Sequence, residues 1–114
     1  GEPVDARRLA EEAAVIAGRT REMQQLVRSA EILAAVAVEQ RDHERALRLV
    51  ASASVFRDKL HIARTRPEQD RFEATWSGLE RAFGSARLET WQDEACGSLA
   101  ELVACCLEPA TTPA

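Results

Sequence analysis

The feature that most constrains the fold of this chain is the spacing of its apolar residues, which is clearest between Pro67 and Gly84. Large apolar side chains recur there at positions i, i+4, i+7 and i+11: Phe72, Trp76, Leu79 and Phe83. Residues spaced in this way share one side of a helix with 3.6 residues per turn. Pro67 suits the start of such a helix and Gly84 suits its end. The pattern predicts an amphipathic helix over 67–83 that turns its aromatic side toward a core.

The same periodicity predicts five further helices. They are expected over residues 3–17, 21–40, 43–60, 86–96 and 99–107. Gly18 suits the end of the first helix, since glycine is favoured just past a helix C-terminus. Side chains that commonly cap helix N-termini precede the other four, at Thr20, Asp42, Ser85 and Ser98. Helix boundaries are therefore expected at each of these positions.

A hairpin is predicted over 21–62, because the connection at 41–43 is too short to allow anything but antiparallel helices. Ala34, Ala46 and Ala53 lie twelve and seven residues apart across this hairpin, where small residues allow two helices to approach closely. This is the pattern of a tetratricopeptide-like repeat of about 34 residues. We therefore expect an all-α fold of about six helices, in which antiparallel hairpins stack as a tetratricopeptide-like right-handed superhelix. Residues 1–107 form one domain in this interpretation, and 108–114 form a linker or tail.

Charge and hydropathy exclude two classes of partner. The chain carries 15 Lys and Arg against 19 Asp and Glu, and no segment forms a basic stripe, so direct binding to nucleic acid is not expected. No run of 18 apolar residues occurs, so no membrane span is expected. A cytoplasmic location is the default expectation, because no basic segment precedes an apolar stretch at the N-terminus.

The residues that commonly carry chemistry are few and scattered. His43 and His61 belong to different elements and have no metal-ligand spacing. Cys96, Cys105 and Cys106 contain no Cys-x-x-Cys and have no neighbouring histidine, so we expect them to be small apolar fillers. The chain has no glycine-rich phosphate loop. The sequence therefore predicts no enzyme, no metal and no cofactor.

Three segments resemble a known family. The stretch RALRLVASASVFR at 45–57 resembles an Ala- and Leu-rich segment, and RPEQDRFEA at 66–74 resembles the proline-containing start of the next helix. Trp91 followed by SLAE at 98–101 resembles a closing pattern. Together they resemble the C-terminal tetratricopeptide-like regions of bacterial signal-transduction ATPases and of large LuxR-type transcriptional regulators, which are common in actinobacteria.

The resemblance covers residues 28–107. The chain departs from the family pattern at Glu94 and Gly97, so we expect a displaced turn before the last helix. In that family such a region follows a nucleotide-binding module, and a DNA-binding helix-turn-helix follows it in the LuxR-type members. The resemblance implies a non-catalytic interaction or regulatory module. Its implied partners are the rest of the parent regulator and other proteins, with a homodimer through the exposed repeat face as a further possibility.

Two surfaces are candidate sites. If Ala34 is the tight-packing position, a groove on the concave side would be lined by Arg28, Glu31, Ala35 and Val38. The alternatives for these residues are plain solvent exposure or packing against a preceding repeat.

The other candidate is an apolar pocket that would sense a small-molecule effector. Its lining residues would be Phe56, Phe72, Trp76 and Trp91. Aromatic residues at helical spacing are more often part of a core than of a ligand pocket, so both interpretations stay open.

Overall fold

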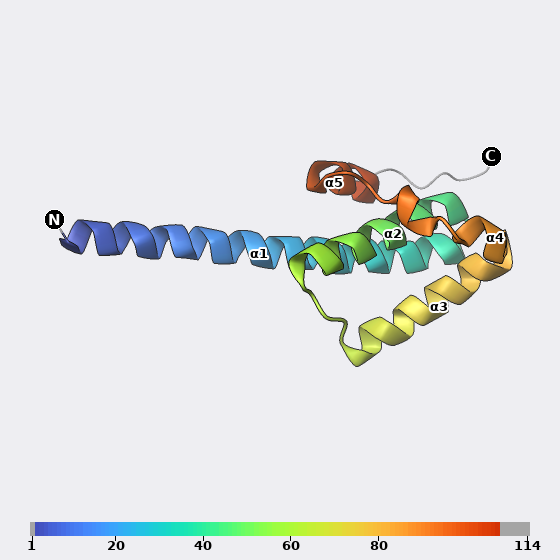
Figure 1. Ribbon diagram of the computed structural model, residues 1–114. Coiled ribbons are helices and arrows are strands. Elements are labelled where there is room, and N and C mark those ends of the chain that lie inside the picture. Colours follow the sequence, from blue (N-terminus) through green and yellow to red (C-terminus); the bar gives the residue numbers. More distant parts are fainter. Residues whose placement is uncertain (1, 108–114) are drawn as a thin grey trace.

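The computed structural model describes the backbone of residues 2–107, and the side chains of 19, 21–98 and 100–107. Within this part of the chain there are five α-helices, one 3-10 turn and no strand (Figure 1). The elements are α1 (Glu2–Glu39), α2 (His43–Leu60), α3 (Arg66–Phe83), α4 (Ser85–Leu88), the 3-10 turn η1 (Trp91–Glu94) and α5 (Leu99–Leu107). The all-α class is confirmed. None of the described helices is long and apolar enough to cross a membrane.

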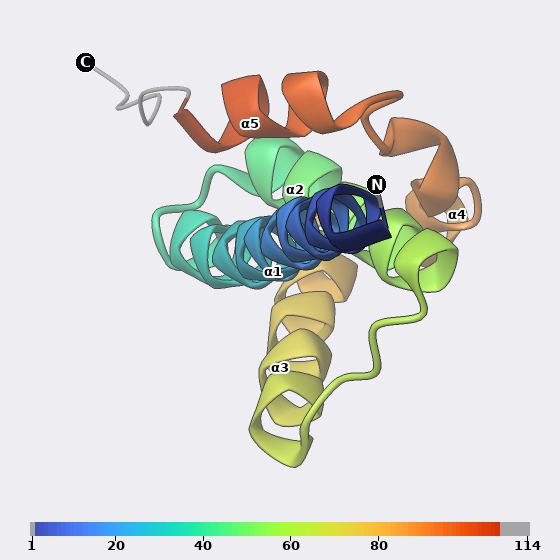
Figure 2. The ribbon, with the colours of Figure 1, turned by 90° about the vertical axis from the view of Figure 1, so that its left-hand side faces the viewer.

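The centre of the fold is the antiparallel hairpin of α1 and α2, as predicted. Figures 1 and 2 show α5 on one side of this hairpin and α3 on the other. Alanines from both helices are fully buried where the two helices meet, among them Ala34, Ala46 and Ala53. The described residues contain this one hairpin, so the stacking of hairpins into a superhelix stays a prediction.

The turn between α1 and α2 is held by backbone hydrogen bonds. Arg41 has a φ of 62°, and the N–H groups of Arg41 and Asp42 donate to the carbonyls of Val38 and Ala37 at 3.1 and 2.8 Å. These bonds satisfy carbonyls at the end of α1 that have no partner within the helix. Asp42 lies at the N-cap position of α2 as predicted, but its carboxylate makes no capping hydrogen bond, so the prediction of a side-chain cap was wrong.

The predicted break at 18–20 does not exist. α1 is one helix of 38 residues, so Gly18 and Thr20 lie in its interior. A glycine costs about 1 kcal/mol in a helix interior and a threonine less. Strong helix formers flank both residues (Ala13, Ala14 and Ala17 before them, and 21–25 after them), and adding one residue to an existing helix costs far less than starting a new one.

The start of α3 contains a motif that the sequence analysis missed. Thr65 and Glu68 form a capping box: the N–H of Glu68 donates to Thr65 Oγ1 at 3.3 Å, and the N–H of Thr65 donates to Glu68 Oε1 at 2.9 Å. These two hydrogen bonds satisfy backbone N–H groups at the start of α3 that have no partner within the helix. Gly84, with a φ of 78°, ends the helix as predicted.

The predicted helix over 86–96 was wrong, and the chain there is α4 followed by η1. Ser85 is the first residue of α4 and Gly84 occupies the N-cap position, so Ser85 does not cap this helix. Contacts with the hairpin and α3 replace a regular helix: Cys96 N–H donates to Ser52 Oγ on α2 at 2.8 Å, and the ring of Trp91 lies against that of Trp76 on α3. Tertiary contacts here override the local helix propensity.

α5 begins where predicted, with Ser98 Oγ accepting from the N–H of Glu101 at 3.2 Å. Only part of its apolar surface faces the core. Leu102 and Cys105 are buried, whereas Val103 is 41% exposed and Leu107 is 77% exposed. Arg45 of α2 donates to the carbonyl of Cys106 at 3.2 Å, which fixes the end of α5 against the hairpin.

α1 and α3 lie close together at Gly78. A Cβ placed on this glycine would lie 2.6 Å from Cγ1 of Val38, a distance that carbon atoms do not tolerate. Val38 is β-branched and has one strongly preferred rotamer in a helix, so it cannot easily turn away. Glycine is therefore required here by packing, although it is unfavourable within a helix.

This contact predicts that Gly78→Ala changes the free energy of unfolding in opposite directions in two backgrounds. We expect Gly78→Ala to lower the free energy of unfolding by about 1–2 kcal/mol, because overpacking outweighs the gain in helix propensity. In a Val38→Ala background the same substitution should raise stability, by up to about 1 kcal/mol. Urea unfolding followed by circular dichroism measures both differences. If Gly78→Ala is stabilising in both backgrounds, the close approach of α1 and α3 is wrong.

Candidate functional site

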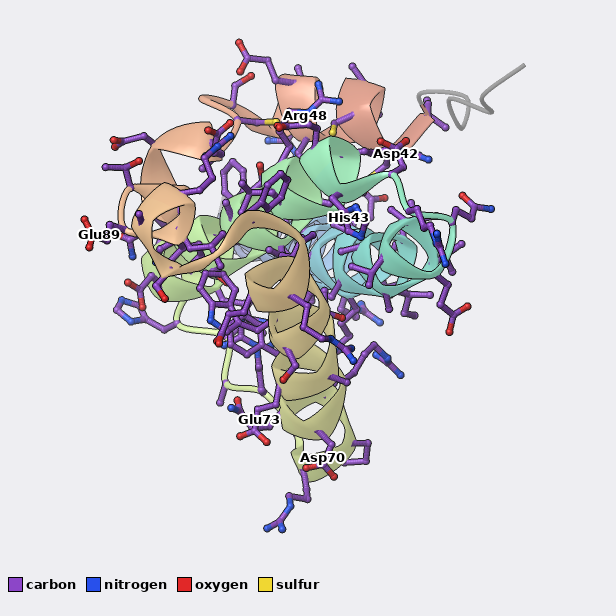
Figure 3. The ribbon with its side chains drawn as sticks, turned by 90° about the vertical axis from the view of Figure 1, so that its right-hand side faces the viewer. Asp42, His43, Arg48, Asp70, Glu73 and Glu89 are labelled. Atoms are coloured by element: carbon purple, nitrogen blue, oxygen red, sulfur yellow. The ribbon has the colours of Figure 1, made fainter. Side chains whose placement is uncertain are left out.

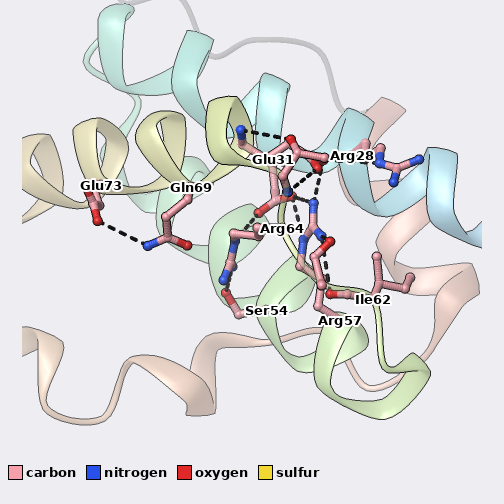
Figure 4. Close-up of polar contacts among 11 residues, drawn as sticks. Arg28, Glu31, Ser54, Arg57, Ile62, Arg64, Gln69 and Glu73 are labelled. Atoms are coloured by element: carbon pink, nitrogen blue, oxygen red, sulfur yellow. Dashed lines mark hydrogen bonds and ion pairs between the residues drawn. The ribbon is translucent and has the colours of Figure 1, made fainter.

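The polar centre of the molecule is the guanidinium of Arg57, which is 4% exposed between α1, α2 and α3 (Figure 4). An arginine has five N–H donors, and all five are used here. Nε and Nη2 donate to Glu31 Oε1, Nη2 also donates to Glu68 Oε2 at 2.7 Å, and Nη1 donates to the carbonyls of Ile62 and Ala63 at 3.3 and 2.9 Å. One side chain thus joins three helices and the loop between α2 and α3.

Arg64 extends this network on its outer side. Its Nε donates to Glu31 Oε2 at 3.0 Å, and its Nη2 donates to Ser54 Oγ at 2.9 Å. The guanidinium carbon lies 4.1 Å from the ring centroid of Phe72, a distance suited to a cation–π contact. We call Arg28, Glu31, Arg57, Arg64 and Glu68 the arginine–glutamate network.

The environment of Glu68 favours its charged form. Burial alone would raise the pKa of this carboxyl group, but hydrogen bonds from the backbone and side chain of Thr65, followed by the bond and charge of Arg57, lower its pKa to about 2. Arg28 adds a further ion pair, with Nε 3.1 Å from Glu68 Oε2. Burial acts to lower the pKa of Arg57, but the two carboxylates outweigh it and the pKa is raised.

These pKa values favour a structural role for the network. A general acid or base works best with a pKa near the operating pH, whereas Glu68 and Arg57 are both shifted away from neutrality. Neither group is suited to exchanging protons near pH 7. The network therefore holds α1, α2 and α3 together, and we assign it no chemistry.

The four residues of the predicted groove lie in the second half of α1. Glu31 is buried in the network, Arg28 is bonded to Glu68 of α3, and Val38 lies against Gly78 of α3. Ala35 is half-buried on the same helix. Three of the four predicted groove residues therefore belong to the network or contact α3.

Three residues of the predicted apolar pocket form an aromatic row. The rings of Phe72 and Trp76 are stacked at 6.0 Å, and those of Trp76 and Trp91 meet edge to face at 5.1 Å. A depression of about 410 Å³ lies beside the two tryptophans, and its lining residues are Trp76, Glu80, Ser85, Leu88, Glu89 and Trp91. Phe56, the fourth predicted residue, is buried in the core.

Histidines and carboxylates outside the network are dispersed. Figure 3 shows Asp70 and Glu73 pointing outward from α3, Glu89 at another edge of the molecule, and His43 at the start of α2. The His43 ring lies 6.1 Å from that of Phe83, and His61 is exposed at the end of α2. Over the described residues, no three His, Cys, Asp or Glu side chains are grouped so that they could hold a metal ion.

The cysteines lie where α5 meets the hairpin. Cys105 is buried in the core, and Cys96 and Cys106 are half-buried and pack against it. Burial raises the pKa of the Cys106 thiol, with a smaller contribution from Cys96, while Arg45 opposes the shift. A raised pKa reduces the thiolate fraction near neutral pH, which suits a packing role better than a nucleophilic one.

Comparison with known proteins leaves the family open. No protein-family model matches the chain, and no curated protein or solved structure matches it either. The likeness to the helical regions of bacterial regulators therefore stays a prediction from the sequence.

Proposed function

We propose that this chain is a non-catalytic helical contact module of a bacterial transcriptional regulator. The observation that carries the proposal is the length of α1. It has 38 residues whereas α2 has 18, so α2 can accompany only about half of it. Figure 1 shows the N-terminal half of α1 extending away from the other helices. A helix projecting from a packed domain is suited to binding another helix, because helices in water are stabilised mainly by packing an apolar side.

The chemistry of the described residues supports the same proposal. The buried charges of Glu31, Arg57 and Glu68 are used within the arginine–glutamate network, and the buried Arg45 bonds the end of α5. The apolar side chains of Val103 and Leu107 are exposed. The resemblance of residues 28–107 to the helical regions of signal-transduction ATPases and LuxR-type regulators supplies the class of parent protein. In the proposed setting the module contacts the nucleotide-binding part of that protein and stacks on further helical hairpins.

The complete coding sequence around residues 1–114 tests this proposal. We expect it to encode a phosphate-binding loop upstream, a helix-turn-helix downstream, or both. The purified nucleotide-binding part should then co-elute with this chain on a sizing column. A coding sequence with neither feature, or a nucleotide-binding part that does not bind the chain, would contradict the proposal.

The aromatic row favours one alternative, a domain that senses a small apolar effector. Trp76 and Trp91 lie together beside a depression of about 410 Å³, which falls within the range of small-molecule sites. Here we expect tryptophan emission to be quenched, and the melting temperature to rise, with at least one member of a panel of small aromatic and aliphatic acids. Trp91→Leu should abolish the response. If no compound changes the emission or the melting temperature, this alternative is wrong.

A further inference from the structure

α1 carries one regular pattern from end to end. Ten positions follow one another at alternating steps of three and four residues: Ala6, Leu9, Ala13, Ile16, Thr20, Met23, Val27, Ala30, Ala34 and Ala37. Thr20 is the one polar residue among them. This is the a/d pattern of a heptad repeat, which forms the seam between two helices packed side by side. We call these ten positions the α1 seam.

The α1 seam is covered in its second half. Its last four residues are between 0 and 1% exposed, and this is the stretch that packs against α2 in the hairpin. The sequence pattern continues in the first half, on the projecting part of α1, where Figure 1 shows no other helix alongside. The sequence pattern of this helix–helix interface therefore continues along α1 beyond the stretch that α2 covers.

An apolar hollow lies at the end of the part of the α1 seam that α2 covers. It has a volume of about 430 Å³ and is lined by Arg19, Glu22, Met23, Leu26 and Val103. Met23 belongs to the seam, and Val103 of α5 is 41% exposed. A helix laid along the uncovered seam would end in this hollow and cover both side chains.

We propose that the uncovered half of α1 pairs with the same segment of a second copy of this chain, antiparallel and centred between residues 14 and 15. This inference rests on the proposed contact function, because it names the partner of the projecting helix. Residues 6–23 of the two copies overlap over about 27 Å at 1.5 Å per residue. The N-terminal end of each helix then reaches the hollow of the other copy. A twofold axis relates the copies, as in most homodimers.

The residue sizes along the seam fit this register. It places Ala6 opposite Met23 of the second copy and Ala13 opposite Ile16 of the second copy. Leu9 then lies opposite Thr20 of the second copy. Each layer thus combines a larger and a smaller residue, which lets the two helices interdigitate. A parallel pair would instead stack alanine on alanine at 6 and 13, and would leave gaps in those layers.

The charges beside the seam fit this antiparallel register as well. Glu12 and Arg19 flank the seam on the same side, and the antiparallel register brings each opposite the other residue of the second copy. Because the dimer is symmetric, the contact between Glu12 and Arg19 occurs twice. The other flank carries the small residues Ala10 and Ala17. An antiparallel register shifted by one heptad, centred on residue 11, would place Glu12 opposite Glu12 and leave the hollow uncovered. Opposite charges at these flanking positions are the usual determinant of register and partner.

Sedimentation equilibrium of the full chain tests the proposal with two matched variants. We expect the wild-type chain to dimerise, and Ile16→Asp to weaken dimerisation by about 100-fold or more, because a carboxylate would enter an apolar seam. Val15→Asp makes the same change at the adjacent position, outside the seam, and should change the dissociation constant by less than about threefold. Equal helix content by circular dichroism shows that both variants are folded. Equal weakening by the two variants would overturn the proposal.

A charge exchange tests the register. Glu12→Arg should weaken dimerisation, since it would face Arg19 of the second copy, and the double variant Glu12→Arg, Arg19→Glu should restore it. Failure of the double variant to restore dimerisation would overturn the register.

A wild-type chain that stays monomeric at high concentration would overturn the pairing. The contact function would nevertheless stand if the nucleotide-binding part of the parent protein bound the wild-type chain and Val15→Asp but not Ile16→Asp.

Discussion

Replacing Arg57 by methionine should lower the free energy of unfolding by about 3–5 kcal/mol, the largest effect that we expect from a single substitution. The change removes all five hydrogen bonds of the guanidinium and leaves Glu31 and Glu68 buried without their common partner. Breaking a buried ion pair by removing one partner typically costs this much, because the remaining charge loses its compensation. Methionine keeps much of the side-chain volume, so the loss reports the charge rather than a cavity. Urea unfolding followed by circular dichroism measures it.

Arg66→Met provides the matched control. Arg66 pairs with Asp70 at 3.5 Å, but the two side chains are 89% and 64% exposed. Exposed ion pairs of this kind contribute between about 0 and 1 kcal/mol. A second check adds Glu31→Gln and Glu68→Gln to Arg57→Met, which removes the buried charges and should recover part of the lost stability. A loss below about 1 kcal/mol for Arg57→Met alone would show that the network does not hold the helices together.

Acidification gives the second largest effect, through Glu68. Its pKa is about 2 in the folded chain and 4.5 in its ordinary state, so folding favours the charged form. A group whose pKa is lowered by folding contributes stability above its unfolded pKa and loses it as the pH falls toward the folded value. We therefore expect Glu68 to contribute about 3 kcal/mol at neutral pH, and this contribution to disappear between about pH 5 and pH 2.

Urea unfolding at a series of pH values separates this contribution from that of the other carboxylates. Glu68→Gln should reduce the pH dependence of stability over this window. Glu73→Gln, at an exposed position on the same helix, should leave it close to that of the wild-type chain. If Glu68→Gln and the wild-type chain lose the same amount of stability between pH 5 and pH 2, Glu68 is not held in its charged form by folding.

The sequence predicted the parts of the fold that a regular apolar pattern determines. The helix through Phe72 and Trp76 and the hairpin through Ala34 and Ala46 follow directly from spacing. The continuity of α1 did not follow, because Gly18 and Thr20 resemble a helix end and its cap. Each of the two residues costs little free energy within a helix, and the strong helix formers on both sides keep the helix continuous. The break within 86–96 depends on the contact of Trp91 with Trp76, which no local pattern contains.

The candidate site was harder to predict than the fold. Arg28 and Glu31 were interpreted as groove residues because their partners, Arg57 and Glu68, lie 26 to 40 positions away in the chain. Two local signals for the network nevertheless existed. Glu31 occupies a core-facing position between Val27 and Ala34, where a charged residue requires a partner. Thr65 followed three residues later by Glu68 is the pattern of a capping box.

The network and the α1 seam have complementary roles in this account. Arg57, Glu31 and Glu68 fix the second half of α1 to α2 and α3, so the first half projects from a rigid base. A projecting helix that is already positioned loses less conformational freedom when it binds. The stability of the domain and the availability of its proposed contact surface therefore depend on different halves of one helix.

Hydrogen exchange along α1 tests this division most directly. It should be measured on the full chain at concentrations well below and well above the dimer dissociation constant. We predict that the amides of residues 27–37 are protected equally at both concentrations, since α2 covers them in a single chain. The amides of residues 6–22 should exchange rapidly in the dilute sample and become protected in the concentrated one. Protection that is the same in both halves and independent of concentration would show that the first half of α1 is not a free contact surface.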